Sequence, residues 1–312
     1  MAKINPFKNK DVILIKDFSR KDLLYLFKKA DQIEKMPDDV RMHLLDGKIL
    51  GYLFFEPSTR TRLSFEAAML WLGGGALGFA EPKISSVEKG ENLADTIRTV
   101  ENYVDVIVMR HSKDGAASFA AEVAKKPVIN GGSGTEEHPT QAMLDLYTMI
   151  KEKGSIDGLK IGLFGDLKYG RTVHSLLYGL SMFDVEVKLI SHPILRVRRE
   201  IFFDLERKMK ISEHENVEEV LPDLDVLYVT RIQKERFPDL AEYERLRSSY
   251  YVDLKMLQKA KKDLILLHPL PRVDEISPEV DGSPHAKYFK QMLNGKILRA
   301  ALLASILNVG FP

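Results

Sequence analysis

Short apolar runs rich in Val, Ile, Leu and Phe recur along the chain, and polar stretches separate them. They span residues 48–55, 104–111, 125–130, 159–166, 185–191, 225–231 and 263–271. Continuous runs of this length are typical of strands that are buried on both faces of a parallel sheet. We therefore predict one buried strand in each run.

The stretches between these runs have helical spacing. Apolar side chains repeat every three or four residues within 93–104, 143–150 and 173–180, which is typical of amphipathic helices. Ser19, followed three residues later by Asp22, is a variant of the capping box and predicts the start of an earlier helix. Strands that alternate with helices indicate the α/β class.

At 312 residues the chain is too long for one ordinary core. We expect two domains, each a parallel β-sheet flanked by helices, with the active site in the cleft between them. Because no repeat or low-complexity linker marks a boundary, we place it near Thr140, giving domains of 1–139 and 140–289. The apolar C-terminal segment, 290–312, is expected to pack back onto the first domain as a buried helix.

Composition excludes several classes of function. With 46 Lys and Arg against 45 Asp and Glu, no long-range field favours nucleic acid or an anionic membrane. The absence of cysteine excludes disulfides and thiolate zinc sites, and the histidines show no metal-ligand spacing, so we expect no metal. The N-terminal residues lack the apolar region of a signal peptide, and no segment is long and apolar enough for a span. These features predict a soluble cytoplasmic protein.

Polar clusters follow most of the predicted strands. In chain order they read EPSTRT, MRH, NGGSGTEEHPTQ, GDLKYGR, TRIQKER and HPLPR. Open parallel sheets bind ligands outside the carboxyl ends of their strands. We therefore expect the six clusters to converge on one site.

The segment STRTR carries Ser58, Thr59, Arg60 and Thr61 at the predicted start of a helix. Hydroxyls, free first-turn amides and a guanidinium suit an anion such as phosphate. A capped helix with solvated arginines explains the same residues, and both interpretations stay open here. Arg62, one residue further, is interpreted as structural. The segment lacks the Gly-rich loop and Lys of a Walker motif, so no nucleotide is inferred.

The other clusters add further candidates. Arg110 ends one strand, and His138 precedes a helix whose positive end favours a neutral ring able to donate a hydrogen bond. Arg171 and Arg231 at two strand ends suit a dicarboxylate held at both ends, although either could be structural. GDLKYGR lacks the G-x-G-x-x-G spacing, which disfavours an NAD-dependent dehydrogenase. Ser85 and Lys89 lie in a loop for which a solvated surface role is the alternative.

The segments FFEPSTRTRLSFE, SxxxKGE, VMRH, HPTQAMLDLYT, GDLKYGRTVHSL, YVTRIQKERF and HPLPRVDEI together resemble the catalytic chains of the aspartate carbamoyltransferase family, from near residue 48 onward. The resemblance implies transfer of the carbamoyl group of carbamoyl phosphate to the amino group of L-aspartate, in de novo pyrimidine biosynthesis, with no cofactor. It implies a carbamoyl phosphate-binding domain at 1–139 and an aspartate-binding domain at 140–289.

The resemblance also implies roles for individual residues. The phosphate would be bound by Ser58, Thr59, Arg60 and Thr61, and the carbamoyl oxygen by Thr61, Arg110 and His138. Gln141 and the Leu270 carbonyl, beside Pro271, would hold the carbamoyl amino group. The aspartate carboxylates would be bound by Arg171, Arg231 and Gln233. Ser85 and Lys89 would reach a neighbouring subunit's site, which implies a homotrimer with shared sites.

Alternatives stay open at this point. An ornithine or related transcarbamoylase is disfavoured because HPLPR has no Cys, no Ser-Met-Gly motif is present, and the cationic TRIQKER suits a second carboxylate. A catalytically silent, scaffold-forming homologue is a different class of function. A separate regulatory chain in a larger assembly also stays open. Glu136 and Glu137 replace the Asn and Gln that are more usual in the family, and we expect their side chains to point away from the cleft.

Overall fold

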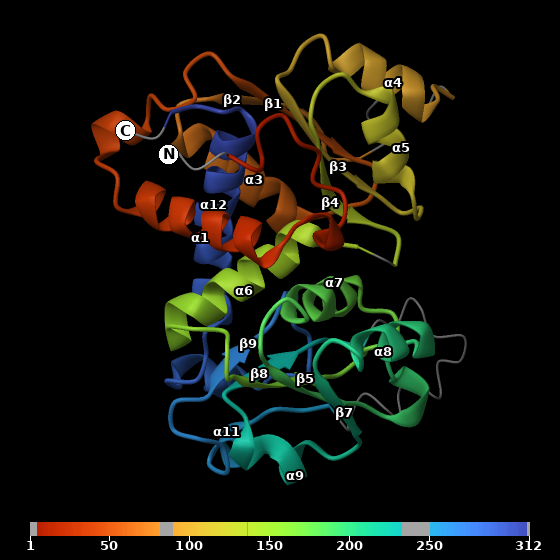
Figure 1. Ribbon diagram of the computed structural model, residues 1–312, viewed down its shortest axis with the longest axis vertical. Coiled ribbons are helices and arrows are strands. Elements are labelled where there is room, and N and C mark those ends of the chain that lie inside the picture. The colour runs from red at the N-terminus through yellow and green to blue at the C-terminus, as the bar shows by residue number, and fades with distance from the viewer. Residues whose placement is uncertain (1–4, 82–89, 136, 233–249, 311–312) are drawn as a thin grey trace. The chain divides into compact units, whose positions relative to one another are not determined.

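The computed structural model describes residues 5–81, 90–135, 137–232 and 250–310. The chain divides into two compact units, Met1–Leu144 with Leu293–Pro312, and Asp145–Met292. Both boundaries lie within helices, α6 (Pro139–Lys153) and α12 (Tyr288–Ile306), which Figure 1 labels. The boundary expected near Thr140 therefore lies in the first turn of a helix, and no linker separates the units there.

The sheet of the first unit has four parallel strands in the order β2-β1-β3-β4. Their bounds are Ile49–Phe54 for β1, Gly75–Phe79 for β2, Val106–His111 for β3 and Val128–Ser133 for β4. Three of them confirm the strands predicted at 48–55, 104–111 and 125–130. The edge strand β2 was not predicted, because its sequence GALGF has glycines and no continuous run of strand-forming side chains.

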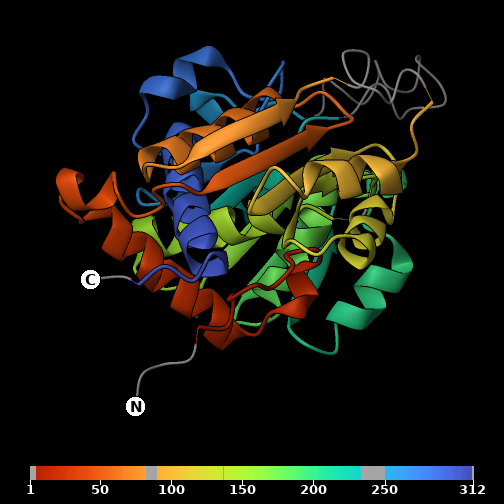
Figure 2. The ribbon, with the colours of Figure 1, turned by 90° about the horizontal axis from the view of Figure 1, so that it is seen from above.

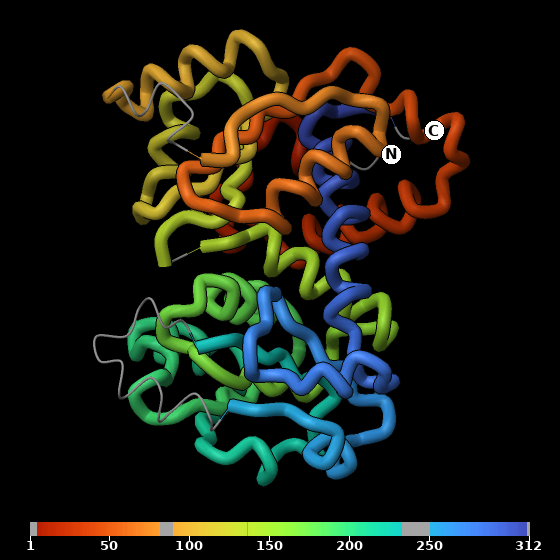
Figure 3. Tube along the Cα trace, turned by 180° about the vertical axis from the view of Figure 1, so that it is seen from behind, coloured from red at the N-terminus to blue at the C-terminus, as the bar shows by residue number. Residues whose placement is uncertain are grey.

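Helices cover both faces of this sheet. On one face α4 (Leu93–Val100) and α5 (Ala116–Val123) lie side by side, as Figures 1 and 2 show, and enclose a core with alternate residues of β1 and β3. On the other face α3 (Thr59–Trp71) brings Thr61 close to Val108, with both methyl groups beside Gly131. The C-terminal helix α12 returns to α3, as the trace in Figure 3 shows. The Arg299 guanidinium of α12 lies 4.9 Å from the centre of the Phe65 ring of α3.

The N-terminal helices complete the first unit. Helix α1 (Arg20–Glu34) begins with the predicted capping box: the Asp22 amide donates to the Ser19 hydroxyl at 3.3 Å, and the Ser19 amide donates to the Asp22 carboxylate at 2.9 Å. After α2 (Asp38–Arg41), the Arg41 guanidinium and the Lys296 ammonium each lie 4.1 Å from the Trp71 ring centre. This pair of cation–π contacts joins α2, α3 and α12.

The sheet of the second unit has five parallel strands in the order β7-β6-β5-β8-β9. Their bounds are Lys160–Phe164 for β5, Glu186–Ile190 for β6, Lys210–His214 for β7, Val226–Val229 for β8 and Ile265–Leu267 for β9. Four of them confirm the predictions at 159–166, 185–191, 225–231 and 263–271. The edge strand β7 was not predicted, since its sequence KISEH is mostly polar and only half-buried.

Among the described residues of the second unit are the helices α7 (Arg171–Leu180), α8 (Arg199–Leu205), α9 (Val217–Val220) and α11 (Leu254–Leu257). Short 3₁₀ turns lie at Pro193–Leu195, Leu221–Asp223 and Pro278–Gly282 in this unit, and at Ile15–Asp17 in the first unit. Helix α7 is buried on almost all sides. Phe164, Leu227 and Leu266 from three adjacent strands belong to one buried core. Among the residues that the structure describes, no helix has both the length and the apolar character that a membrane span requires.

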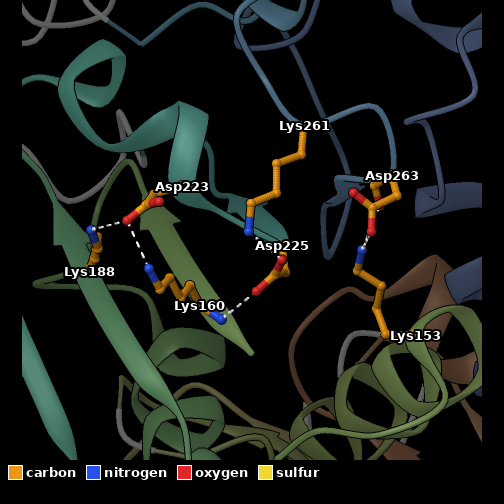
Figure 4. A network of polar contacts seen from close by, with 7 residues as sticks. All are labelled: Lys153, Lys160, Lys188, Asp223, Asp225, Lys261 and Asp263. Carbon is orange, nitrogen blue, oxygen red and sulfur yellow. Dashed lines mark hydrogen bonds and ion pairs between the residues drawn. The ribbon is translucent and has the colours of Figure 1, made fainter. Parts of the chain in front are cut away.

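Aspartates cluster with lysines at the amino ends of the strands of the second unit (Figure 4). The Asp225 carboxylate, just before β8, accepts the Lys160 amide at 2.8 Å through one oxygen and the Lys261 ammonium at 2.7 Å through the other. Asp223 pairs with the Lys160 ammonium at 2.9 Å and with that of Lys188 at 3.7 Å. The first backbone donor of β5 is thereby satisfied by a side chain.

The first unit uses the same arrangement. Asp105, just before β3, accepts the Ile49 amide of β1 at 2.9 Å and lies 3.4 Å from the Lys48 ammonium. In return the Asp105 amide donates to the Ile49 carbonyl at 2.8 Å. In both sheets an aspartate therefore sets the register of two adjacent strands at their amino ends.

Replacing Asp225 tests whether this aspartate stabilises the pairing of β5 and β8. We expect Asp225→Ala to lower the free energy of unfolding by about 1–3 kcal/mol, because it leaves the Lys160 amide without its acceptor. Urea unfolding followed by circular dichroism measures the change. Asp263→Ala is the control, since the Asp263 side chain is 75% exposed, against 17% for Asp225, and the Asp263 carbonyl still accepts from Lys153. Equal losses in the two variants would contradict the interpretation.

Candidate active site

The carboxyl ends of β1, β3 and β4 lie next to one another in the first unit, because these strands are neighbours in the sheet. EPSTRT follows β1, MRH forms the last three residues of β3, and NGGSGTEEHPTQ begins within β4 at Asn130 and continues beyond it. As predicted, three of the six polar clusters therefore meet at one edge of a sheet.

The start of α3 distinguishes between the two interpretations of STRTR. Ser58 occupies the N-cap position, yet its side chain makes no capping hydrogen bond, and the first turn contains no acidic residue. Thr59 and Arg60 are exposed. A helix start without a side-chain cap, with hydroxyls and a guanidinium beside it, favours the anion site.

Arg62 is separate from this anion site. Its Nη1 donates to both carboxylate oxygens of Glu66, one turn further along α3, at 3.0 and 2.9 Å. The guanidinium also lies 5.8 Å from the centre of the Tyr52 ring. These contacts agree with the prediction that Arg62 is structural.

Thr61 and His138 meet although 77 residues separate them. The Thr61 hydroxyl lies 3.4 Å from Nε2 of His138, and both side chains are buried. Pro139 is the first residue of α6, as predicted, so His138 stands at the positive end of that helix. Gln141 follows within the first turn, where its amide donates to the His138 carbonyl at 3.0 Å.

Arg110 is held at the end of β3 by two acceptors. Its Nη2 donates to a Glu56 carboxylate oxygen at 3.1 Å, and its Nη1 donates to the Gly131 carbonyl at 3.3 Å. Sequence reasoning assigned Glu56 no role, although the residue lies within EPSTRT. Next to Arg110, burial and the Lys113 charge lower the pKa of His111, and Glu56 opposes this only in part.

Asn130 shapes the loop that supplies the Gly131 carbonyl. Its amide nitrogen donates to the Ile13 carbonyl at 3.1 Å and to the Ser133 hydroxyl at 2.9 Å, while its oxygen accepts the Gly132 amide at 2.9 Å. Gly132 has a φ of 113°, a conformation that glycine adopts easily. Sequence reasoning missed Asn130, and the signal available was an amide side chain directly before two glycines.

In the second unit the ends of β5, β8 and β9 are adjacent. The Asp166 carboxylate accepts the Lys168 and Tyr169 amides at 3.1 and 2.9 Å, which forms the turn leading into α7. Arg171 is the first residue of α7 and is largely buried, while Arg231 directly follows Thr230 at the end of β8. The Thr230 hydroxyl donates to the Asp166 carbonyl at 3.5 Å, which joins the two segments.

The remaining predicted site residues are Leu270 and Pro271, in the segment after β9, and three residues outside the described chain. Leu270 is half-buried, with a φ of 54°, and Pro271 is exposed. Ser85, Lys89 and Gln233 lie outside the described residues, as does Glu136. Glu137 is buried, and its carbonyl accepts the Ser133 amide at 3.2 Å.

Each unit thus presents one kind of binding chemistry. The first combines a helix N-terminus, hydroxyls, His138 and Arg110, which suits a phosphorylated group with a polarisable carbonyl. The second places Arg171 and Arg231 at neighbouring strand ends, which suits carboxylates. Within residues 5–81, 90–135, 137–232 and 250–310, no group of three His, Asp or Glu side chains is placed to hold a metal ion.

Two family models match the chain. Residues 10–151 match the carbamoyl-P binding domain of aspartate/ornithine carbamoyltransferase, and residues 157–306 match the Asp/Orn binding domain. The aspartate carbamoyltransferase catalytic subunit of Nitrosopumilus maritimus is 56% identical over 305 residues, covering 98% of this chain and 99% of that protein. That of Thermofilum pendens is 57% identical, covering 97% of each.

Solved structures of aspartate transcarbamoylases are also similar to this chain. The catalytic subunit of M. jannaschii aspartate transcarbamoylase has a TM-score of 0.90 and 49% identity, covering 96% of this chain and 98% of that one. Aspartate transcarbamoylase from Trypanosoma cruzi in complex with carbamoyl phosphate and aspartate has a TM-score of 0.92 and 42% identity, covering 97% and 98%. The predicted fold class, two domains that each contain a parallel β-sheet flanked by helices, is therefore confirmed.

The Asn130 loop provides a test of the site in the first unit. We expect Asn130→Ala to reduce stability by about 1–3 kcal/mol, because the Ile13 carbonyl and the Gly132 amide lose their partner. Inorganic phosphate should also raise the thermal midpoint less than in the native chain, since the carbonyl that holds Arg110 becomes less fixed. Asn102→Ala removes an exposed amide that donates to the Arg98 carbonyl, and serves as the control. An unchanged phosphate response in Asn130→Ala would contradict the assignment.

Proposed function

The chain belongs to the aspartate/ornithine carbamoyltransferase family, and from this premise we propose how its residues divide the reaction between them. It is a transferase that moves the carbamoyl group of carbamoyl phosphate to the amino group of L-aspartate, giving N-carbamoyl-L-aspartate and phosphate. This statement rests on sequence identities of 55–57% to three aspartate carbamoyltransferase catalytic subunits. Each alignment covers nearly the whole of this chain and of the relative.

Aspartate is favoured over ornithine by these relatives and by charge. Arg171 begins the helix that follows β5, and Arg231 lies after the adjacent strand β8, within the cationic stretch TRIQKER. A second carboxylate on the substrate is complementary to these cations, whereas the ammonium group of ornithine would be repelled.

Carbamoyl phosphate is assigned to the first unit. The phosphate binds at the start of α3, with the side chains of Ser58, Thr59, Arg60 and Thr61 and the first-turn amides of the helix as donors. Two features of the start of α3 support this assignment: the Ser58 side chain makes no capping hydrogen bond, and the first turn contains no acidic residue. Ser85 adds a further donor from a neighbouring subunit in this proposal.

The carbamoyl oxygen is assigned to Thr61, Arg110 and His138. The 3.4 Å approach of Thr61 to His138 and the two acceptors that hold Arg110 support a preorganised set of donors. Gln141 and the carbonyl of Leu270, with Pro271 beside it, hold the carbamoyl amino group. The carboxylates of aspartate bind Arg171 on one side and Arg231 and Gln233 on the other, with Lys89 contributed by a neighbouring subunit.

The chemistry follows from these assignments. The amine of aspartate attacks the carbamoyl carbon, a C–N bond forms, and negative charge grows on the carbamoyl oxygen. The C–O bond to the phosphate then breaks, and phosphate departs with the electron pair and takes up the proton that the amine nitrogen loses. Fixed donors act where this charge develops, which lowers the barrier more than it stabilises the bound substrates. The protein also aligns two anions that repel each other in solution.

A homotrimer with shared sites forms part of the proposal. A threefold ring joins two different faces of each subunit. Exposed apolar side chains on two elements of the first unit support this: Leu70 on α3 is 62% exposed, and Tyr103 after α4 is 60% exposed. These elements lie on opposite faces of the sheet, as a heterologous contact requires.

The wider setting is also proposed. The product, N-carbamoyl-L-aspartate, places the reaction in de novo pyrimidine biosynthesis in the cytoplasm. The relatives are named catalytic subunits. By analogy, this chain would be the catalytic component of a larger assembly that contains a separate regulatory chain. No cofactor takes part in the proposed reaction.

An assay of carbamoyl-aspartate formation, run in parallel with ornithine, tests the function. We expect product from aspartate and none from ornithine. His138→Ala should lower kcat by about 100- to 1000-fold, since one donor to the developing oxyanion is lost. His43→Ala, which removes an exposed histidine paired with Asp46, should leave kcat unchanged. Turnover of His138→Ala at the native rate would refute the assignment of that residue.

Mixing two inactive variants tests the shared sites. Lys89→Ala and Arg60→Ala should each be inactive as pure proteins. After joint dissociation and reassembly, some interfaces combine an intact Arg60 with an intact Lys89, so activity should return in part. A mass measurement in solution gives the subunit number independently. Activity that does not return in mixed assemblies of confirmed composition would exclude sites shared in this way.

A further inference from the structure

The segment after β9 holds Leu270 in an unusual conformation. Its φ of 54° lies in the left-handed region, which leucine rarely adopts because its Cβ crowds the following carbonyl. The next residue, Pro271, has a fixed φ of its own and restricts the backbone of the residue before it. Such a conformation persists only where surrounding contacts hold it.

His268 provides the contact nearest to Leu270. Its Nδ1 lies 2.8 Å from the Leu270 amide nitrogen. An amide N–H can only donate, so Nδ1 accepts and carries no proton, and the proton of the neutral ring is on Nε2. Nε2 lies 2.7 Å from a Glu275 carboxylate oxygen, to which it donates. The two contacts fix both the tautomer and the orientation of the ring.

Glu275 joins His268 to the backbone of the residues that follow Pro271. Its other oxygen accepts the Val273 and Asp274 amides at 3.0 and 3.1 Å. His268 and Glu275 are only 1% and 7% exposed, so water does not compete with these bonds. Burial raises the pKa of Glu275, but the hydrogen bonds from His268 and the backbone amides outweigh it, and the pKa lies below its usual range.

A second series of buried hydrogen bonds holds the backbone of His268. Its backbone amide donates to the Gln291 side-chain oxygen at 3.0 Å, and the Gln291 amide donates to Asp145 at 2.6 Å. The other Asp145 oxygen accepts the Tyr228 hydroxyl at 2.8 Å. All these side chains are fully buried, so the segment is tied to α12, α6 and β8 within the second unit.

We propose that His268 is a positioning residue, which holds the Leu270 amide so that the Leu270 carbonyl is aimed at the amino group of the carbamoyl substrate. The inference rests on the proposed function, in which that carbonyl accepts a hydrogen bond from the substrate. With the amide held on one side and Pro271 restricting the other, the carbonyl has little freedom to turn. His268 does not touch the substrate and acts only through Leu270.

Two variants of His268 separate its two hydrogen bonds. In His268→Asn the side-chain oxygen occupies nearly the place of Nδ1, so it can accept the Leu270 amide but cannot reach Glu275. In His268→Gln the terminal amide reaches the place of Nε2, so it can donate to Glu275 but offers no acceptor to Leu270. Each variant keeps one bond and loses the other.

The proposal predicts that the two His268 variants differ in activity. His268→Gln should lower kcat/KM for carbamoyl phosphate about 10- to 100-fold, as expected when a binding group is misplaced by about 1 Å, with KM for aspartate nearly unchanged. His268→Asn should stay within about threefold of the native enzyme. His285→Asn is the control, because the His285 ring lies in the same unit and is hydrogen-bonded to a different backbone group, the Leu264 carbonyl.

The thermal midpoint is measured for each variant, because a purely structural role predicts that activity follows stability. Activity that falls equally in both His268 variants, or only in His268→Asn, overturns the proposal. If neither variant folds, Glu275→Gln and Glu275→Leu repeat the test at the partner of His268. The Gln oxygen can still accept from Nε2 of His268, although its NH₂ group cannot accept the Val273 and Asp274 amides, whereas Leu offers no acceptor at all. Activity is expected to fall less in Glu275→Gln than in Glu275→Leu, and equal activities would overturn the proposal. A native enzyme that forms no carbamoyl-aspartate would instead refute the proposed function.

Discussion

Both units depend on the pairing of backbone groups at the ends of short parallel strands. Strands of three to six residues have few ladder hydrogen bonds, so an unpaired amide at the start of a strand weakens its register. Asp105 in the first unit and Asp225 in the second supply that missing acceptor from the strand next in the sheet. With the amino ends held by side chains, the carboxyl ends lie together, and their polar side chains can serve a ligand.

The two edges of each sheet therefore differ in chemistry. The amino edge of the second unit is occupied by Lys–Asp pairs that satisfy one another. The carboxyl edges instead carry cations and hydroxyls beside the backbone: Thr61, Arg110 and His138 in one unit, Arg171 and Arg231 in the other. Acidic groups near these positions have assigned partners, as Glu56 has Arg110 and Glu275 has His268, so the cationic character of the edges is kept.

Much of the fold could be predicted because buried parallel strands and amphipathic helices have local signatures. The seven apolar runs became strands, the capping box at Ser19 starts a helix, and Pro139 opens another. The two missed strands, β2 and β7, lie at sheet edges. An edge strand buries less side-chain surface, so selection for apolar side chains is weaker there, and GALGF and KISEH carry no such pattern.

The residue types at the strand ends, and with them the anionic substrates and the family, could be predicted from the amino-acid sequence alone. Local order along the chain contains that information, because each cluster lies at or just after the end of its own strand. The pairing of these residues emerges only in the folded chain: Thr61 with His138, Glu56 with Arg110, Asn130 with Ile13 and His268 with Gln291. These partners are tens of residues apart, and their meeting depends on strand order and register, which no local window of sequence specifies.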